Sequence, residues 1–141
     1  MLYRIPTVIL WITVAFWIQK VYGDPYYFEV YIRCHENVKS CCGDLMIYEE
    51  DDRNHDIIKT EQFCTNQNSM NFIYDPVYPG GDFGFEYEFK YRLNHTCTDS
   101  GQQRCIQLDE AVDANKGYPK NIHWYISTYN RGRLECYPDG W

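Results

Sequence analysis

The sequence predicts an all-β domain: a β-sandwich of about seven strands that is held by disulfides and contains at most one short helix. Three observations predict this class. Apolar and polar residues alternate with a period of two in much of the chain, turn-forming residues separate the alternating segments, and seven cysteines occur in one small domain. Because the 141 residues contain no internal repeat and no linker, we expect a single domain.

The strands can be placed from this alternation. The first begins near Tyr26, and its predicted core face carries Phe28, Val30, Ile32 and Cys34. The clearest alternation lies between Gly84 and Leu93, where aromatic residues and leucine occupy the odd positions and charged residues the even ones. One face of that strand should pack and the other should contact water. The remaining strands are expected at 44–49, 57–64, 69–74, 104–108 and 121–129.

Turn signals separate these strands. Turns are predicted at Gly43, in the acidic stretch 49–56, at 66–68 and in the proline- and glycine-containing segment 75–82. One short helix is conceivable at 108–114, because apolar residues there stand at i, i+3 and i+4. It would form a turn or two attached to the sheet.

Residues 1–23 are predicted to be a secretory signal peptide. They combine a basic residue, an apolar run over 5–18 and small residues at the cleavage positions Val21 and Gly23. A membrane anchor is the alternative, but this run is shorter than the roughly 20 residues that span a bilayer. Residues 24–141 would then form the mature domain, and we expect a secreted, extracellular protein with no transmembrane segment after cleavage.

The charge of the mature chain excludes one class of partner. Removal of 1–23 also removes Arg4 and Lys20, which leaves 11 basic and 20 acidic residues and a net charge of −9. Nucleic-acid binding needs clustered Lys and Arg that neutralise phosphates, so no nucleic acid is expected as a partner. Aromatic residues make up 18% of the sequence, which argues against a disordered chain.

The cysteines are interpreted as disulfide candidates, because exported domains of this size use disulfides to supplement a small core. They are Cys34, Cys41, Cys42, Cys64, Cys97, Cys105 and Cys136. An odd number predicts three disulfides and one remaining thiol, which could link two chains in a homodimer; spacing alone leaves the pairing open. The adjacent Cys41 and Cys42 are expected to bond to different partners, because a bridge between them would strain their peptide.

Other groups of residues that could suggest catalysis or metal binding have structural explanations. Cys34-His35 and His95-x-Cys97 bring imidazole near sulfur, but disulfide bonding removes the thiolate that nucleophilic chemistry needs. The cysteines and histidines lack the paired spacing of a zinc site. The acidic run 49–52 with Asp56 lacks the pattern of a calcium-binding EF-hand loop and is predicted to be a solvated loop. We therefore predict no catalytic, cofactor-binding or metal-binding residues.

Two kinds of residue are candidates for interactions at the surface. Asn94 begins the only Asn-x-Ser/Thr sequon and is a candidate glycosylation site. Tyrosines are abundant on the predicted strands, and five of them are candidates for recognition: Tyr26, Tyr27, Tyr31, Tyr125 and Tyr129. Ordinary β-propensity is the alternative explanation for the same tyrosines, and it is slightly favoured.

The order of several segments resembles that of nematode transthyretin-like proteins, which are small secreted β-sandwiches. The most specific part is Leu93-x-His95-x-Cys97 followed by Cys105; Ile32-Arg33-Cys34, the segment 45–51 and a late Cys136 also agree. The resemblance implies a transthyretin-like sandwich, of the general kind that immunoglobulin domains also form. It also implies a short disulfide between Cys97 and Cys105.

The sequence departs from that family in three places. The family's glycine in the first strand and its Gly-x-Phe hairpin signal near Phe72 are missing, and Cys41, Cys42 and Cys64 are additional. Hydrolase relatives end in Tyr-Arg-Gly-Ser, whereas this chain ends in Cys-Tyr-Pro-Asp-Gly-Trp. The resemblance therefore implies no enzymatic activity of that kind.

These observations favour a secreted, non-catalytic binding module of the transthyretin-like type. Its ligand would be an extracellular protein, a lipid headgroup or a small apolar molecule, recognised by exposed aromatic residues. A second hypothesis is a secreted disulfide-rich signalling ligand or protease inhibitor that acts through the loop 75–82. A third is a hydrolase that uses His35, His95 or His123.

Overall fold

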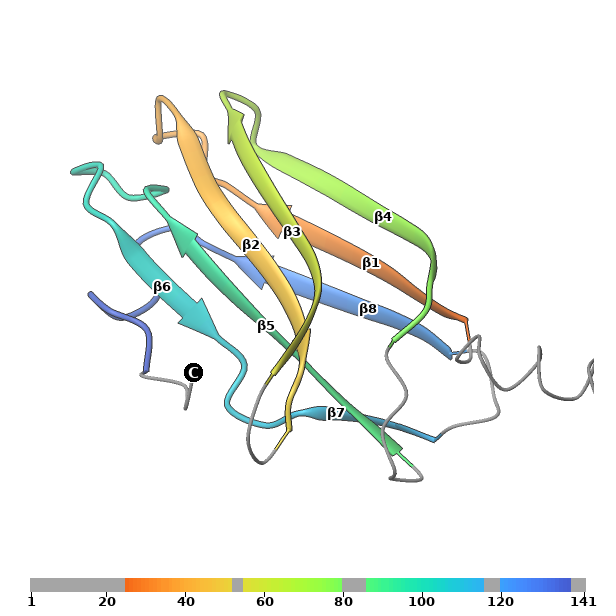
Figure 1. Ribbon diagram of the computed structural model, residues 1–141. Helices are drawn as coiled ribbons and strands as arrows, with labels where there is room; N and C mark the ends of the chain where they lie inside the picture. The colour runs from red at the N-terminus through yellow and green to blue at the C-terminus, as the bar shows by residue number, and fades with distance from the viewer. Residues whose placement is uncertain (1–24, 52–54, 80–85, 116–119, 138–141) are drawn as a thin grey trace, which may run out of the picture.

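A computed structural model describes residues 25–51, 55–79, 86–115 and 120–137. These residues form two β-sheets stacked as layers (Figure 1). The strands are β1 (Tyr26–Arg33), β2 (Cys41–Glu49), β3 (Asp56–Thr65), β4 (Ser69–Val77), β5 (Glu86–His95), β6 (Arg104–Gln107), β7 (Val112–Asn115) and β8 (Lys120–Ser127). The predicted all-β sandwich is confirmed. The predicted signal peptide lies outside the described residues.

The chain crosses several times between the two sheets. One sheet has the order β4-β1-β8, and the other has the order β3-β2-β5-β6, with β7 also paired to β5. Every pairing is antiparallel except that of β1 with β8. This order differs from that of constant-type immunoglobulin domains, in which the first strand pairs with the second. The first and last strands therefore lie side by side in the smaller sheet.

Aromatic residues fill the space between the sheets. Phe28 of β1 lies edge-on to Phe89 of β5 at 5.1 Å between ring centroids, and it also packs against Trp124 of β8 at 5.6 Å. Along β5 the odd residues from Tyr87 to Leu93 are buried, while the even ones are exposed or half-buried. The alternation in the sequence thus places one face of each core strand inside the sandwich.

The short helix that was conceivable at 108–114 does not form. No helix occurs in the described part of the chain, and β7 occupies the end of this segment as an eighth strand. β6 pairs only with the second half of β5, so β7 pairs with the first half and buries Ala114 opposite Tyr87. Backbone pairing along the open edge of β5 outweighs the weak helical pattern of a few residues.

Two predicted turns belong to strands. Gly43 lies within β2, where a Cβ atom would stand 2.6 Å from the carbonyl oxygen of Asn94 and 2.8 Å from the Phe63 ring. Glycine is needed there for close packing and not for a turn. Asp75 and Pro76 lie in β4, an edge strand, where a missing backbone N–H is tolerated. The end of the predicted loop 75–82 lies outside the described residues.

The acidic stretch is only partly a solvated loop. Glu49 is buried at the end of β2, and the side chain of Glu50 accepts a hydrogen bond of 2.7 Å from Lys90 of β5. Asp56 is exposed at the start of β3, as predicted. The predicted turn at 66–68 is present between β3 and β4. In the described residues, no helix long and apolar enough to cross a bilayer was found.

Candidate functional site

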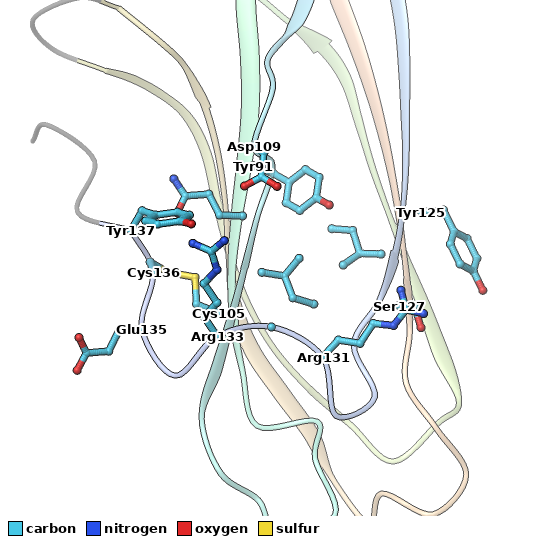
Figure 2. A pocket seen from close by; sticks show the side chains of 14 residues that line it. Tyr91, Cys105, Asp109, Tyr125, Ser127, Arg131, Arg133, Glu135, Cys136 and Tyr137 are labelled. Atoms are coloured by element: carbon cyan, nitrogen blue, oxygen red, sulfur yellow. A yellow bond between two sulfur atoms is a disulfide. The ribbon is translucent and has the colours of Figure 1, made fainter.

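Two disulfides have unambiguous partners. Cys42 and Cys64 face each other directly on β2 and β3, with their Cα atoms 4.0 Å apart. Cys105 of β6 bonds to Cys136, with Cα atoms 5.2 Å apart, and so holds the C-terminal segment against β6 (Figure 2). The prediction that this chain contains disulfides is confirmed.

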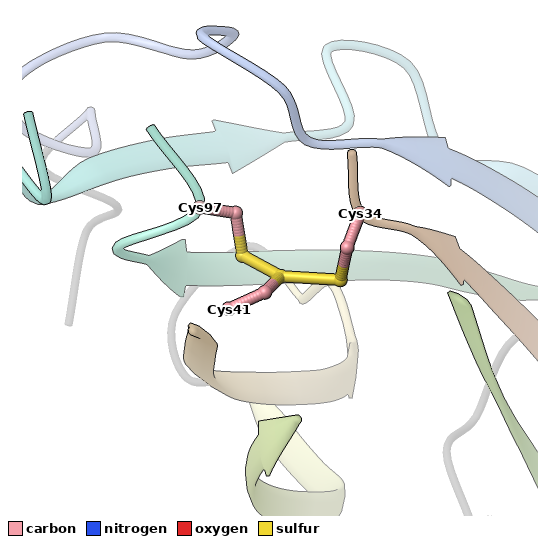
Figure 3. Close-up of side chains that lie close together, drawn as sticks. All are labelled: Cys34, Cys41 and Cys97. Carbon is pink, nitrogen blue, oxygen red and sulfur yellow. A yellow bond between two sulfur atoms is a disulfide. The ribbon is translucent and has the colours of Figure 1, made fainter. Parts of the chain in front are cut away.

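The other three cysteines form one cluster, which we call the cysteine cluster. Cys34, Cys41 and Cys97 are all buried, and their sulfur atoms lie within 4.8 Å of one another (Figure 3). Cys41 is in disulfide contact with both Cys34 and Cys97. Because a cysteine sulfur forms only one disulfide, Cys41 can be bonded to Cys34 or to Cys97 but not to both at once. The spacing of these cysteines in the sequence does not suggest such a cluster.

The bridge between Cys97 and Cys105, implied by the resemblance, is not formed. In the pairing of β5 with β6, Cys105 lies opposite Asn94, three residues before Cys97. Cys97 belongs to the core cluster between the sheets, and Cys105 lies under the C-terminal segment. Adjacent Cys41 and Cys42 have different partners because neighbouring residues of a strand point to opposite faces.

Burial of the cysteine cluster bears on the predicted homodimer. Each member exposes at most 3% of its surface. A disulfide between two chains needs an accessible thiol, and this cluster presents none. The odd cysteine therefore gives no support to a disulfide-linked dimer.

His95 is a structural residue. It is 1% exposed, its Nδ1 atom accepts the backbone N–H of Cys97 at 3.2 Å, and its Nε2 atom lies 3.2 Å from the carbonyl oxygen of Arg131. Burial lowers its pKa to about 4 because the imidazolium form would lose its hydration. A neutral ring whose two nitrogen atoms are both engaged with the backbone is poorly placed to act as a general base.

The other two candidate histidines have partners of their own. The His35 ring stacks on Tyr129 at 3.9 Å, and the Tyr129 hydroxyl donates a hydrogen bond of 3.0 Å to Asp99. His123 lies on β8, and its Nδ1 atom is 3.0 Å from a carboxylate oxygen of Glu29. The structure thus places His35, His95 and His123 in three different settings.

The five candidate tyrosines differ in how much of each side chain is exposed to solvent. Tyr26 is fully buried and donates a hydrogen bond to the Asn115 carbonyl, so it is a core residue and not a recognition group. Tyr27 and Tyr129 are half-buried. Tyr31 and Tyr125 are exposed, at 36% and 61%, and their rings stack 5.1 Å apart with an interplanar angle of 13°.

The stacked pair lies on the solvent side of the β4-β1-β8 sheet, which we call the outer face. Its residues alternate with the core residues of the same strands: Glu29, Tyr31 and Arg33 of β1, Asn71 and Ile73 of β4, and His123 and Tyr125 of β8. Tyr31 is directly opposite both Asn71 and Tyr125 in the strand register. Along the strands, the tyrosine pair thus lies between Glu29 and His123 on one side and Arg33 on the other.

Side-chain hydrogen bonds hold the outer face in place. Glu29 accepts a bond of 2.8 Å from Asn71, besides its contact with His123. These contacts lower the pKa of Glu29 by stabilising its carboxylate. On the other side of the tyrosine pair, Arg33 approaches the Tyr125 hydroxyl at 3.5 Å. Sequence alternation could have found these residues, because each stands at an outward position beside a candidate tyrosine.

A small cleft lies where the two sheets separate, between β6, β8 and the C-terminal segment (Figure 2). Its volume is about 280 Å³, just below the range of roughly 300–1,000 Å³ that is usual for ligand pockets. Arg131, Arg133 and Glu135 give its wall mixed charges, and Arg133 packs on the Tyr137 ring at 3.6 Å. The cleft is a weaker candidate for binding than the outer face.

The candidate glycosylation site lies in the middle of a sheet. Asn94 is part of β5, between β2 and β6, and is half-buried. Its side-chain oxygen lies 3.2 Å from the sulfur of Cys136. Glycosylation of Asn94 stays a prediction.

One family model matches the chain, over residues 29–139, and is described as Caenorhabditis elegans protein of unknown function (DUF870). The chain belongs to this family. The match begins within β1 and extends past Cys136, so it covers all seven cysteines. It agrees with the nematode part of the resemblance, although it is not a match to the transthyretin-like family. No curated protein and no solved structure matches the chain.

Proposed function

We propose that this protein is a secreted, non-catalytic extracellular binding module of the transthyretin-like type, and that its outer face binds another protein. The observation that carries the proposal is the exposed, stacked pair of Tyr31 and Tyr125. Tyrosine and arginine are enriched at protein interfaces, because each offers a large contact area and a polar group.

The shape of the outer face favours a protein over a smaller ligand. Small molecules usually bind in concave pockets, whereas the tyrosine pair lies on the exposed surface of a sheet. The tyrosine rings already stack against each other, so little conformational freedom remains to be lost on binding. Glu29 and Arg33 add a negative and a positive group within the same patch, which would determine the orientation of a partner.

Export is supported by the disulfides. Disulfides persist in oxidising compartments and are rare in the cytosol, and this small sandwich contains several of them. The transthyretin-like assignment rests on the resemblance in the sequence, and the two-sheet architecture is compatible with it. Non-catalytic function is supported by the separate settings of His35, His95 and His123.

Site-specific crosslinking would test this proposal. Tyr125 is replaced by the photoreactive residue p-benzoylphenylalanine in one variant, and Tyr137 is replaced in a matched control. Tyr137 is also about half exposed; it lines the same cleft as Tyr125, but in Figure 2 its ring lies on the opposite side of that cleft. After irradiation with nematode extracellular proteins, we expect a specific crosslinked partner at position 125 and not at 137.

Affinity measurements with that partner would then test the tyrosine pair. We expect Tyr31→Ala and Tyr125→Ala each to weaken binding by about tenfold or more, as is usual for aromatic hot spots. Tyr137→Ala should leave the affinity unchanged, and circular dichroism should show that all variants are folded. Unchanged affinity in both outer-face variants, or loss of binding only when residues 75–82 are replaced, would favour the inhibitor or signalling-ligand hypothesis instead.

A further inference from the structure

The cysteine cluster joins three elements. Cys34 follows β1 of the smaller sheet, Cys41 begins β2 of the larger sheet, and Cys97 follows β5 beside β2. In Figure 3 the sulfur of Cys41 lies between those of Cys34 and Cys97. Attack on a disulfide proceeds with the incoming and leaving sulfurs on opposite sides of the central one. Cys41 is therefore the sulfur that both of the others can reach.

We propose that Cys34, Cys41 and Cys97 form a buried thiol–disulfide exchange centre. Cys41 is always bonded, either to Cys34 or to Cys97, and the remaining cysteine is the single thiol of the domain. This inference is independent of the function proposed for the outer face. It accounts for the odd number of cysteines without an exposed thiol.

The exchange is balanced within the chain. In one direction the thiolate of Cys97 attacks the sulfur of Cys41, the bond between Cys41 and Cys97 forms, and the bond between Cys34 and Cys41 breaks. Cys34 leaves as a thiolate and takes up the proton that Cys97 has lost. The number of disulfides stays the same, so no external oxidant or reductant is needed.

The two forms differ in what they connect. A bond between Cys34 and Cys41 links β1 to β2 and therefore ties one sheet to the other. A bond between Cys41 and Cys97 links β2 to β5, which are neighbours in the same sheet. Neither of the other two disulfides joins a strand of one sheet to a strand of the other. The exchange thus decides whether the two layers are covalently linked at this end of the sandwich.

When Cys97 is the thiol and Cys34 is bonded to Cys41, the S–H group has an acceptor nearby. The sulfur of Cys97 lies 3.9 Å from the carbonyl oxygen of Cys42, which can accept an S–H group. Loop closure favours the same form during folding. Cys34 and Cys41 are 7 residues apart, whereas Cys41 and Cys97 are 56 apart. In an unfolded chain the shorter loop should close about twenty-fold more often.

Disulfide mapping of the purified full-length product tests the proposal directly. The protein is alkylated with N-ethylmaleimide, with and without 6 M guanidinium chloride at about pH 7, and is then digested without reduction for mass spectrometry. We expect one alkylated cysteine per chain, protected until denaturant is added and divided between Cys34 and Cys97. We also expect both cluster disulfides, together with unchanged Cys42–Cys64 and Cys105–Cys136 peptides.

Exchange itself is tested by comparing two starting mixtures. Protein refolded from the reduced state and alkylated early should be enriched in the Cys34–Cys41 bridge. In a separate experiment, refolded protein and secreted protein are each incubated at about pH 8 before alkylation. The two preparations should then reach the same ratio of the Cys34–Cys41 bridge to the Cys41–Cys97 bridge. A permanent difference between the two preparations, or a single bridge in both, would overturn the proposal.

Serine variants provide matched controls. Cys34→Ser should form only the Cys41–Cys97 bridge, and Cys97→Ser only the Cys34–Cys41 bridge. Cys41→Ser should leave Cys34 and Cys97 as two thiols, so a bridge between them would contradict the central role of Cys41. A native protein with all three cysteines reduced, with or without a bound metal ion, would also contradict the proposal. The mapping of the unmodified protein decides the question even if a variant fails to fold.

Discussion

At the scale of single residues, burial changes what a side chain can do. His95 stands two residues before a cysteine, which in the sequence resembles a base beside a nucleophile. In the structure its ring lies between Cys97 and Arg131, and its Nδ1 atom accepts a hydrogen bond from the backbone N–H of Cys97. Burial lowers its pKa to about 4, so the ring is neutral at physiological pH.

This pKa predicts a pH-dependent stability. The unfolded chain binds a proton at His95 near pH 6.5, whereas the folded protein binds it only near pH 4. The contribution is therefore complete above pH 6.5 and is lost as the pH falls toward 4. The free energy of unfolding can be measured with urea at pH 7.5 and at pH 5. Between these two pH values it should fall in the wild type, and this fall should be smaller in His95→Gln by up to about 2 kcal/mol.

The exposed His123 provides the control for this measurement. Its ring lies on the outer face beside Glu29, so His123→Gln should keep most of the acid-dependent loss seen in the wild type. Equal pH dependence in the wild type and His95→Gln would show that His95 is not the residue responsible.

At the scale of elements, the C-terminal segment depends on tertiary contacts. In its described part, residues 131–137, one isolated bridge joins it to β6: Cys105 and Arg133 exchange two backbone hydrogen bonds of 2.8 Å each. The disulfide between Cys105 and Cys136 lies close to that bridge. We expect the disulfide to keep the segment on β6 and so to form one wall of the cleft.

Removal of this disulfide should release the segment. Cys105→Ala combined with Cys136→Ala should lower the free energy of unfolding by about 2–4 kcal/mol, because the unfolded chain gains freedom. Hydrogen exchange should become faster at the backbone amides of positions 105 and 133, whose mutual hydrogen bonds would open. The matched pair Cys42→Ala with Cys64→Ala should cost a similar amount of stability, but it should leave protection at 133 intact. Unchanged exchange in the first variant would show that the segment does not need the disulfide.

At the scale of the whole molecule, two layers meet over an aromatic core. The side chain of Phe28 points between the sheets and is 1% exposed, whereas Tyr31, three residues later in β1, belongs to the outer face. Because β1 is the central strand of its sheet, both of its faces matter: one holds the layers together and the other is available to a partner.

Because the two faces of β1 have different roles, two substitutions in this strand should affect different properties of the protein. Phe28→Ala should lower the free energy of unfolding by about 3–5 kcal/mol, because it leaves a cavity between the layers. Tyr31→Ala should change it by less than about 1 kcal/mol, since its ring is partly solvated, while it weakens partner binding. Chemical denaturation followed by tryptophan fluorescence measures both, and equal losses would contradict the assignment of the two faces.

The local pattern of the sequence determined where most strands lie and which of their faces are buried. Side chains alternate along any extended strand, so the pattern of β5 needs no distant partner to be interpreted. The cysteine content of this small domain likewise predicted that it contains disulfides. The weak helical pattern near Leu108 does not correspond to a helix, because it is too short to outweigh pairing with β5.

Only the tertiary structure decided which strands are neighbours, which cysteines meet and which tyrosines reach solvent. Cys41 and Cys97 are 56 residues apart, and Tyr31 stacks on a residue from the last strand. Such contacts depend on the order of strands in each sheet and on their register, which a short stretch of sequence does not encode. The cysteine cluster and the outer face are each assembled from segments that are distant in the sequence. Their residues come together only in the folded protein.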